Sequence, residues 1–219
     1  MGFPNVDLIL KDLFLREFLA AQLNPQEIVS DLFEDRSNEE QMQIGTYLRS
    51  KSFVGSNRDR SEDGKRVFIL PHFPSAELPF PQIGISHGES PSTERFLGDI
   101  VGESEPVYAS DDETITGWKQ PYGYYEQANF NIDVISATKE ETIWLSRFCQ
   151  YFICQNIGEI GAKGILEVNI SLADIRLEKG AMQPMEAFVR GVRISAKLEN
   201  TWTKTLLNGV YATGNNTAL

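Results

Sequence analysis

Apolar and polar residues alternate with a helical period at the start of the chain. Between residues 6 and 23 apolar side chains recur every three or four positions with charged residues between them, which predicts an amphipathic helix. Asp7 is a candidate cap, and the helix should end at Asn24 because the residue before Pro25 is disfavoured in the helical region. Proline suits a first turn, so a short second helix should follow. The expected apolar face of the first helix comprises Leu8, Ile9, Leu13, Leu15, Phe18 and Leu19.

The next part of the chain has less pattern. Residues 34–65 are polar, charged and punctuated by Gly and Ser, which predicts a weakly ordered insertion with one turn of helix around residues 42–48. Residues 67–70 and 82–85 then have the composition of strands. Four prolines lie between them, and because proline cannot donate a ladder hydrogen bond, a stiff turn without a regular ladder between the two strands is expected.

The period changes from two to about four within residues 128–155. Residues 130–136 alternate as a half-buried strand does, and Thr138 three residues ahead of Glu141 forms a capping-box pattern that starts a helix. Large apolar side chains at four-residue spacing predict that this helix packs against a sheet. Glycines downstream are expected to end it. The stripe comprises Trp144, Phe148 and Phe152, and the glycines are Gly158, Gly161 and Gly164.

Two further strands are predicted at residues 165–170 and 188–198, where apolar side chains occupy alternate positions. Residues 88–125 lack a sustained period and form an acidic, loop-like insertion. Because so long a structureless loop is unusual in a compact domain, it should either carry its own hairpin or be ordered by a partner.

This order of elements predicts an α+β fold, a mainly antiparallel β-sheet flanked by helices on one face. The expected organisation is a single domain over residues 1–203 with insertions at about 34–65 and 88–125. Residues 204–219 are expected to be a flexible or partner-bound tail.

Charge narrows the classes of partner. The 20 basic and 31 acidic residues give a net charge of -11, which opposes sequence-independent attraction to nucleic-acid phosphates. No apolar run approaches the roughly 20 residues that cross a bilayer, and the first residues do not resemble a signal peptide, so synthesis in the cytosol is expected. Cys149 and Cys154 are expected to be reduced packing residues, because their spacing in a helix disfavours a disulfide.

No motif for catalysis or cofactor binding stands out. His72 and His87 lack the paired cysteines or short-spaced carboxylates of metal sites, and the three glycines follow a helix without the Gly-Lys-Ser/Thr of a phosphate loop. Ser86 lies outside a Gly-x-Ser-x-Gly elbow. The acidic residues of the insertion lack the spacing of a calcium loop. We therefore expect no catalytic residue, no cofactor and no metal.

Two sets of side chains in the long insertion are candidates for contacts with other molecules. Aromatic and large apolar side chains are enriched at the centres of protein interfaces, and clustered carboxylates form a solvated acidic surface or repel phosphates. The candidate interface set comprises Phe96, Leu97, Trp118, Tyr122, Tyr124 and Tyr125. The acidic set comprises Asp99, Glu103, Glu105, Asp111, Asp112 and Glu113.

The order of these elements and the sequences of several of them resemble a known class of protein. A helical start, "LPFPQIGISHGES", "YEQANFNIDVISATKEE" and "EAFVRGVRISAKLENTW" are similar to segments of the tail-terminator and neck (tail-completion) proteins of long-tailed bacteriophages. The resemblance spans residues 5–33 and 66–203 and leaves out residues 34–65, much of 88–125 and the tail. It rests on the order of the elements and on the sequences of strands and loops, without an invariant motif.

The resemblance implies a structural protein of the virion, made in the host cytoplasm. Such proteins form a ring, usually a hexamer, on the last ring of the tail tube, where they stop polymerisation and face the neck or head connector. Implied partners are further copies of the chain, the tail-tube protein, the neck and, in a contractile tail, the sheath. DNA would pass without specific binding. The aromatic set would then be buried between subunits, and the acidic set would line the lumen or form an outer acidic surface.

Two alternatives stay open at this point. The chain is also compatible with a head-to-tail connector or adaptor of the neck, because the large acidic insertion departs from smaller terminators. The alternative of another class is a cytosolic enzyme whose site is assembled from distant residues such as His72, His87 and Asp111.

Overall fold

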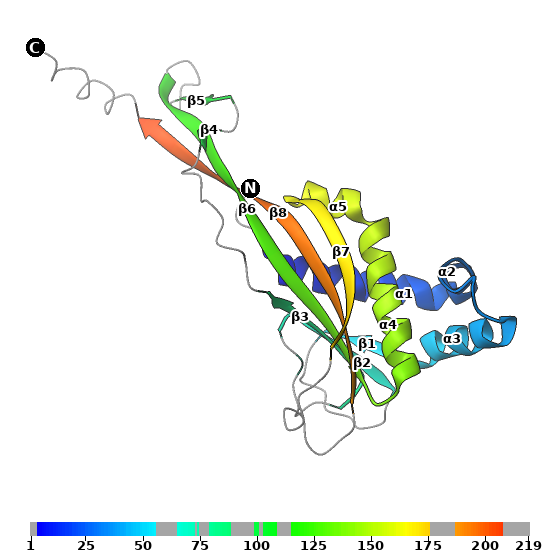
Figure 1. Ribbon diagram of the computed structural model, residues 1–219. Helices are drawn as coiled ribbons and strands as arrows, with labels where there is room; N and C mark the ends of the chain where they lie inside the picture. The colour runs from blue at the N-terminus through cyan, green and yellow to red at the C-terminus, as the bar shows by residue number, and fades with distance from the viewer. Residues whose placement is uncertain are drawn as a thin grey trace, which may run out of the picture.

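The computed structural model describes residues 4–55, 65–72, 74, 79–88, 99–100, 103–108, 115–175 and 187–207. It confirms the α+β class, with the helices gathered on one face of a mixed sheet (Figure 1). The helices are α1 (Val6–Leu23), α2 (Pro25–Leu32), α3 (Asn38–Ser50), α4 (Lys139–Gln155) and α5 (Ile157–Ala162). The strands are β1 (Ser52–Val54), β2 (Arg66–Leu70), β3 (Gln82–His87), β4 (Asp99–Ile100), β5 (Glu105–Tyr108), β6 (Ile115–Ser136), β7 (Ile165–Ile175) and β8 (Phe188–Leu207).

The sheet has the strand order β1-β2-β3-β6-β8-β7, with β4 and β5 paired to β6 off this path. The pairs β1–β2 and β2–β3 are parallel and the others are antiparallel. The expectation that prolines prevent a ladder between β2 and β3 was wrong, because the two strands pair from Phe68↔Gln82 to Leu70↔Gly84. A parallel pair needs a crossover, so the prolines lie in the connection and outside the paired residues.

Helix α1 begins and ends near the predicted positions but buries a different face. Its N-cap is Asn5, whose side chain accepts a hydrogen bond from the Leu8 amide, and Asp7 lies in the first turn. Leu8 and Leu19, expected in the core, are 44% and 54% exposed. Two thirds of the positions of this helix are apolar, more than one face can hold, so the period alone does not select the buried stripe. The stripe observed is Val6, Leu10, Leu13, Phe14, Phe18 and Ala21.

Residues 34–65 contain more structure than predicted. The 13-residue helix α3 and the strand β1 lie within this segment. Helix α3 starts with a full capping box, in which Ser37 accepts from the Glu40 amide while the Glu40 carboxylate accepts from the Ser37 amide. This pattern satisfies amides that a helix start leaves without partners, and it identifies the helix better than the polar composition does.

The helix predicted after Thr138 is confirmed as α4. The Thr138 hydroxyl accepts a hydrogen bond from the Glu141 amide at 3.3 Å, and Phe148 and Phe152 are buried. The predicted role of the glycines was partly wrong, because α4 ends at Gln155 and the first two glycines lie inside the short helix α5. Only Gly164, at φ +84, adopts the left-handed conformation that favours glycine.

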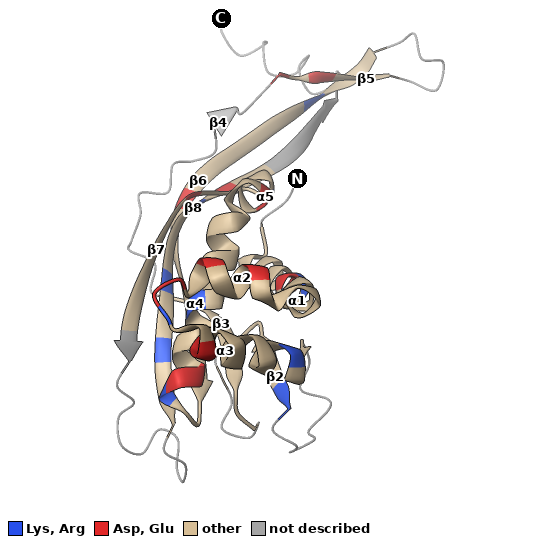
Figure 2. Cartoon of the chain, turned by 90° about the vertical axis from the view of Figure 1, so that its right-hand side faces the viewer, with Lys and Arg blue, Asp and Glu red and all other residues tan. Residues whose placement is uncertain are grey.

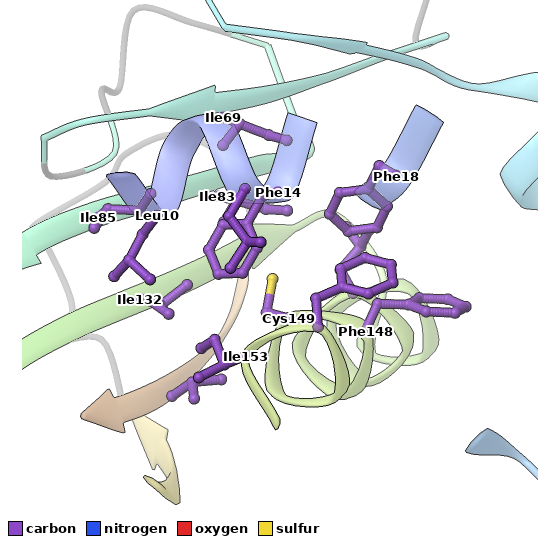
Figure 3. Packing of buried hydrophobic residues seen from close by; sticks show 14 of the residues in the cluster. Leu10, Phe14, Phe18, Ile69, Ile83, Ile85, Ile132, Phe148, Cys149 and Ile153 are labelled. Atoms are coloured by element: carbon purple, nitrogen blue, oxygen red, sulfur yellow. The ribbon is translucent and has the colours of Figure 1, made fainter. Parts of the chain in front are cut away.

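The hydrophobic core lies between the helical layer and the sheet (Figure 3). Phe18 stacks on Phe53 with ring centroids 4.1 Å apart and meets Phe152 edge-on at 5.0 Å. From the sheet, Ile83 and Ile132 point toward the same helices. Such aromatic pairs stabilise beyond the area that they bury, by about 0.5–1.5 kcal/mol each.

Strands β6 and β8 are much longer than predicted. All 20 residues of β8 pair with β6, from Ser136↔Phe188 to Gly117↔Leu207, without a register shift. The predicted loop-like insertion at 88–125 therefore contains β4, β5 and the first half of β6, and the alternative that it carries its own hairpin is confirmed by the antiparallel pair β5–β6. Residues 204–207, assigned to a tail, belong to β8.

Candidate assembly surface

The long strands project beyond the helical layer (Figure 1). Pairing between β7 and β8 ends at Leu198, opposite Glu126 of β6. We define the arm as β4, residues 103–108 (which include β5), residues 115–126 of β6 and residues 199–207 of β8, and the body as the rest of the described chain. The arm is a ribbon in which β6 pairs with β8 on one side and with β4 and β5 on the other.

Most of the predicted interface residues lie on the arm. Trp118, Tyr122 and Tyr124 occupy even positions of β6 and so share one face of the strand, since side chains alternate. Trp118 is 38% exposed. Tyr125 is 43% exposed on the opposite face, where the Lys197 ammonium lies 4.6 Å from its ring centroid. Phe96 and Leu97 lie outside the described residues.

Part of the acidic set also lies on the arm, and part lies outside the described residues. Asp99 begins β4, and Glu103 and Glu105 are exposed on the β5 side of the arm. Figure 2 shows acidic residues on β5, at the far end of the ribbon from the helices. Asp111, Asp112 and Glu113 lie outside the described residues.

The face of the sheet away from the helices, here called the helix-free face, is polar across its centre. Because Ile132 and Ile194 point toward the core, the alternate positions of β6 and β8 point away from the helices. A depression of about 440 Å³ lies over this part of the sheet. Its polar lining comprises Asn129, Asn131, Asn169, Ser171, Arg193 and Ser195.

One ion pair lies at this depression. Arg193 Nη1 is 3.4 Å from Asp133 Oδ1, and the Asp133 side chain is only 3% exposed. Burial raises the pKa of Asp133, and the nearby Arg193 guanidinium opposes that rise. Neither Asp133 Oδ1 nor Arg193 Nη1 makes a hydrogen bond within the described part of the chain. The pair therefore leaves donors of the guanidinium without an acceptor.

A second charged cluster lies where α3, α4 and β6 meet. Lys51 Nζ is 3.1 Å from Glu141 Oε1, and the Ser136 hydroxyl donates to the other oxygen of the same carboxylate. Both ion-pair side chains are largely buried, and Lys51 lies over the ring of Tyr47. Ser136 is fully buried, so a substrate has no route to its hydroxyl. This cluster fixes the start of α4 against α3 and the end of β6.

The histidines are held in separate surroundings. His87 Nε2 lies 3.4 Å from Asp7 Oδ2, and its ring packs on Phe130. Burial raises the pKa of Asp7, and His87 opposes the rise. His72 lies in the connection after β2, where its carbonyl faces Gly84. Asp111, the third member of the dispersed enzyme site considered above, lies outside the described residues.

Clusters of metal ligands and membrane-spanning helices are both absent from the described segments. In these segments no three His, Cys, Asp or Glu side chains converge as metal ligands would. Among the described helices, none combines the length and the apolar content needed to span a bilayer. The free thiol of Cys149 is buried, which raises its pKa, and Cys154 is exposed.

Comparison with known proteins found no match to a protein-family model and no match to a curated protein sequence. The geometry of the arm and the helix-free face is therefore the basis for the functional argument. The polar depression was not predicted from the sequence, although the alternation in β8 carries a signal for it. Arg193, Ser195 and Lys197 occupy every second position between apolar residues.

Proposed function

We propose that this chain is a structural subunit of a bacteriophage tail, which forms a ring at the head-proximal end, ends polymerisation of the tail tube and joins the tail to the neck. Its partners are further copies of itself, most simply six in a ring, with the tail-tube protein on one side and neck proteins on the other. No bond is made or broken in this role, and DNA passes through the ring without specific binding.

The observation that carries the proposal is the arm. A ribbon that leaves the helical layer gains little from its own body, because its side chains have no core to enter. Yet it presents several aromatic rings, and exposed aromatic groups on a projecting element are a feature of surfaces that become buried in assemblies. Tyr108, Trp118 and Tyr125 are between 38% and 49% exposed.

The charge of the chain supports the passage of DNA. A net charge of -11 opposes non-specific retention of phosphates, and this repulsion acts over a screening length of about 8 Å at physiological salt. A ring subunit with this charge would let a duplex slide through its channel.

The experiment is to measure the mass of the purified full-length chain over a range of concentrations and to image its particles by electron microscopy. Rings are expected for the native chain. A Trp118→Ala/Tyr124→Ala variant should lose them, since it removes two large side chains from one face of the arm. A matched control, Leu19→Ala/Leu23→Ala, removes two exposed apolar groups from α1 and should keep the rings.

A chain that stays monomeric at high concentration contradicts the proposal. Rings that bind purified tail tubes and stop their growth support the terminator role. Rings that bind only the head-side neck proteins support the second candidate, a connector or adaptor, which the same arm geometry favours. Turnover of a small molecule that is abolished by alanine at His72 and His87 would support the enzyme alternative instead.

A further inference from the structure

The Arg193 side chain has donors without acceptors. A guanidinium carries five N–H donors in a planar fork, and in folded proteins nearly all such buried groups find partners. Arg193 Nη1 makes no hydrogen bond within the described residues, although this atom is shielded from solvent and the side chain is only 35% exposed. Its ion-pair partner, Asp133 at 3.4 Å, has a side chain that is only 3% exposed.

The surroundings of Arg193 fit an acceptor-rich group. The depression that it lines also contains side-chain amides and hydroxyls, which orient a ligand by hydrogen bonds but carry no charge. A carboxylate accepts two parallel hydrogen bonds from a guanidinium, a geometry that matches both groups. The chemistry of the depression therefore selects a carboxylate.

The arm presents carboxylates of this kind. Glu103 and Glu105 are exposed, and neither takes part in an ion pair with another described residue. Glu105 lies opposite Lys119 in the sheet register. Figure 2 shows the separation: the basic residues of β8 lie along the body, while acidic residues lie on β5 at the end of the arm.

These two surfaces cannot meet within one molecule. Glu105 pairs with Lys119 of β6, and Arg193 pairs with Asn131 of the same strand. Positions 119 and 131 are twelve residues apart on one continuous strand, which is roughly 40 Å at a rise of about 3.3 Å per residue. Because the β6–β8 ladder has no register shift, the arm cannot fold back over its own body.

We propose that the arm of one copy lies across the helix-free face of the next copy, with a carboxylate of the arm, Glu103 or Glu105, bound by Arg193 in the polar depression. The contact is heterologous, since the two surfaces are different, and a repeated heterologous contact closes into a ring when its rotation permits. The inference rests on the proposed ring function and deepens it by assigning the surfaces that join neighbouring subunits. It gives these two glutamates a role at the subunit contact and none in the channel.

Cysteine crosslinking tests the contact directly. Ser171 is exposed, lines the depression and pairs with Arg193 across the sheet. In a full-length Cys154→Ser background, Glu105→Cys combined with Ser171→Cys should give a ladder of covalent oligomers on mild oxidation. The same spacing along β6 prevents an intrachain bond, because a disulfide requires Cα atoms within about 7 Å. Each single-cysteine variant should give dimers at most.

Charge removal gives an independent measurement. Glu103→Gln/Glu105→Gln should raise the concentration needed for half-assembly by about tenfold, because a charge-assisted hydrogen bond to a guanidinium is lost. Arg193→Gln should act in the same direction and Arg193→Lys less strongly. A matched control, Glu39→Gln/Glu140→Gln, removes two exposed carboxylates from the helical layer and should leave assembly unchanged.

The outcomes separate this inference from the proposed function. Rings that form normally but give no ladder, or that are insensitive to the arm glutamates, overturn the inference and leave the ring function standing. A chain that never assembles overturns the ring function itself. Arg193→Gln leaves Asp133 buried without its partner, so its assembly is interpreted only if its circular dichroism and melting temperature match those of the native chain. If this variant does not fold, the Glu103→Gln/Glu105→Gln variant decides the test, because both glutamates are exposed.

Discussion

The two halves of β6 belong to one continuous strand but differ in how far their side chains are buried. Residues 128–136 lie in the body, where apolar side chains such as Phe130 and Ile132 are fully buried against the helices. Residues 115–126 lie in the arm, where Trp118 and Tyr125 remain more than one-third exposed. A strand usually ends where its covering layer ends, because unpacked strands gain little stability. This strand continues for the twelve residues 115–126 beyond its core, which is the feature that the proposed assembly role explains.

The body half also differs in having both faces covered at its end. Asp133 and Ile135 point away from the helices but are buried. On the same face, Phe68 and Leu70 of β2 form a small second cluster, and Pro74 lies against Gly84, which pairs with Asp133 in the sheet. The body half of β6 is thus buried on both faces near Ser136, whereas the arm half is partly exposed. Substitutions in the two halves should therefore differ in what they change.

The largest effect is expected from the body core. Phe18→Ala should lower the free energy of unfolding by about 3–5 kcal/mol, because it empties the space between Phe53 and Phe152. Denaturant unfolding measures the change. Leu19→Ala, one position along on the exposed face, should stay within about 0.5 kcal/mol. Equal effects at the two positions would contradict the buried face assigned to α1.

The next effect concerns the covered part of the helix-free face. A Cβ at Gly84 would lie 2.3 Å from Pro74 Cδ and 2.8 Å from the His72 carbonyl oxygen. Gly84→Ala should therefore destabilise by about 1–3 kcal/mol through overpacking. Gly158 in α5 has nothing within 4 Å of such a Cβ, so Gly158→Ala should be neutral or stabilising. Thermal melts of both variants measure the two effects, and equal melting temperatures would contradict the packing of Pro74 on β3.

A smaller effect depends on pH. Hydrogen bonds from Arg16 and Lys163 lower the pKa of Glu159 from 4.5 to about 2. Its ionised form therefore stabilises the fold above the unfolded pKa, and this contribution is lost as pH falls from about 4.5 toward 2. The stability difference between the native chain and Glu159→Gln should shrink over that window. Glu34→Gln, which removes an exposed carboxylate elsewhere, is the matched control for the loss of one negative charge.

The smallest effect on stability is expected in the arm. Trp118→Ala should change the free energy of unfolding of the monomer by less than about 1 kcal/mol, because the ring is over one-third exposed and distant from the core. The same variant should weaken assembly, as sedimentation would show. A loss of stability as large as that of Phe18→Ala would mean that the arm belongs to the core, and the comparison between the halves would fail.

The elements with strong local signals could be predicted from sequence. Thr138 and Glu141 placed the start of α4, and Pro25 separated α1 from α2. Composition misled at α3, whose residues are polar on most positions even though Ile44 and Leu48 are fully buried. The Ser37–Glu40 spacing held the information that composition hid. Periodicity failed in α1 for the opposite reason, because too many positions are apolar.

The arm and the depression were harder to predict for physical reasons. In the arm, β6 contains Gly117, Pro121 and Gly123, which weaken a strand signal, and no face is uniformly apolar because no core covers it. The aromatic candidates were identified by type, but their placement along one ribbon comes from pairing with β8. Arg193 and the asparagines around it are far apart in sequence and come together only through strand order.

The unbroken ladder between β6 and β8 has one more consequence. Side chains alternate strictly along a strand, so the burial of Phe130 and Ile132 in the body determines which face of the arm carries Trp118 and Tyr122, about a dozen positions away. Inserting one residue into both β6 and β8 at the boundary would move these aromatic rings to the opposite face of the arm. Inserting two residues into each strand would return the rings to their original face and only lengthen the arm. The hydrophobic core of the body thus determines the orientation of aromatic side chains in the arm that it does not contact.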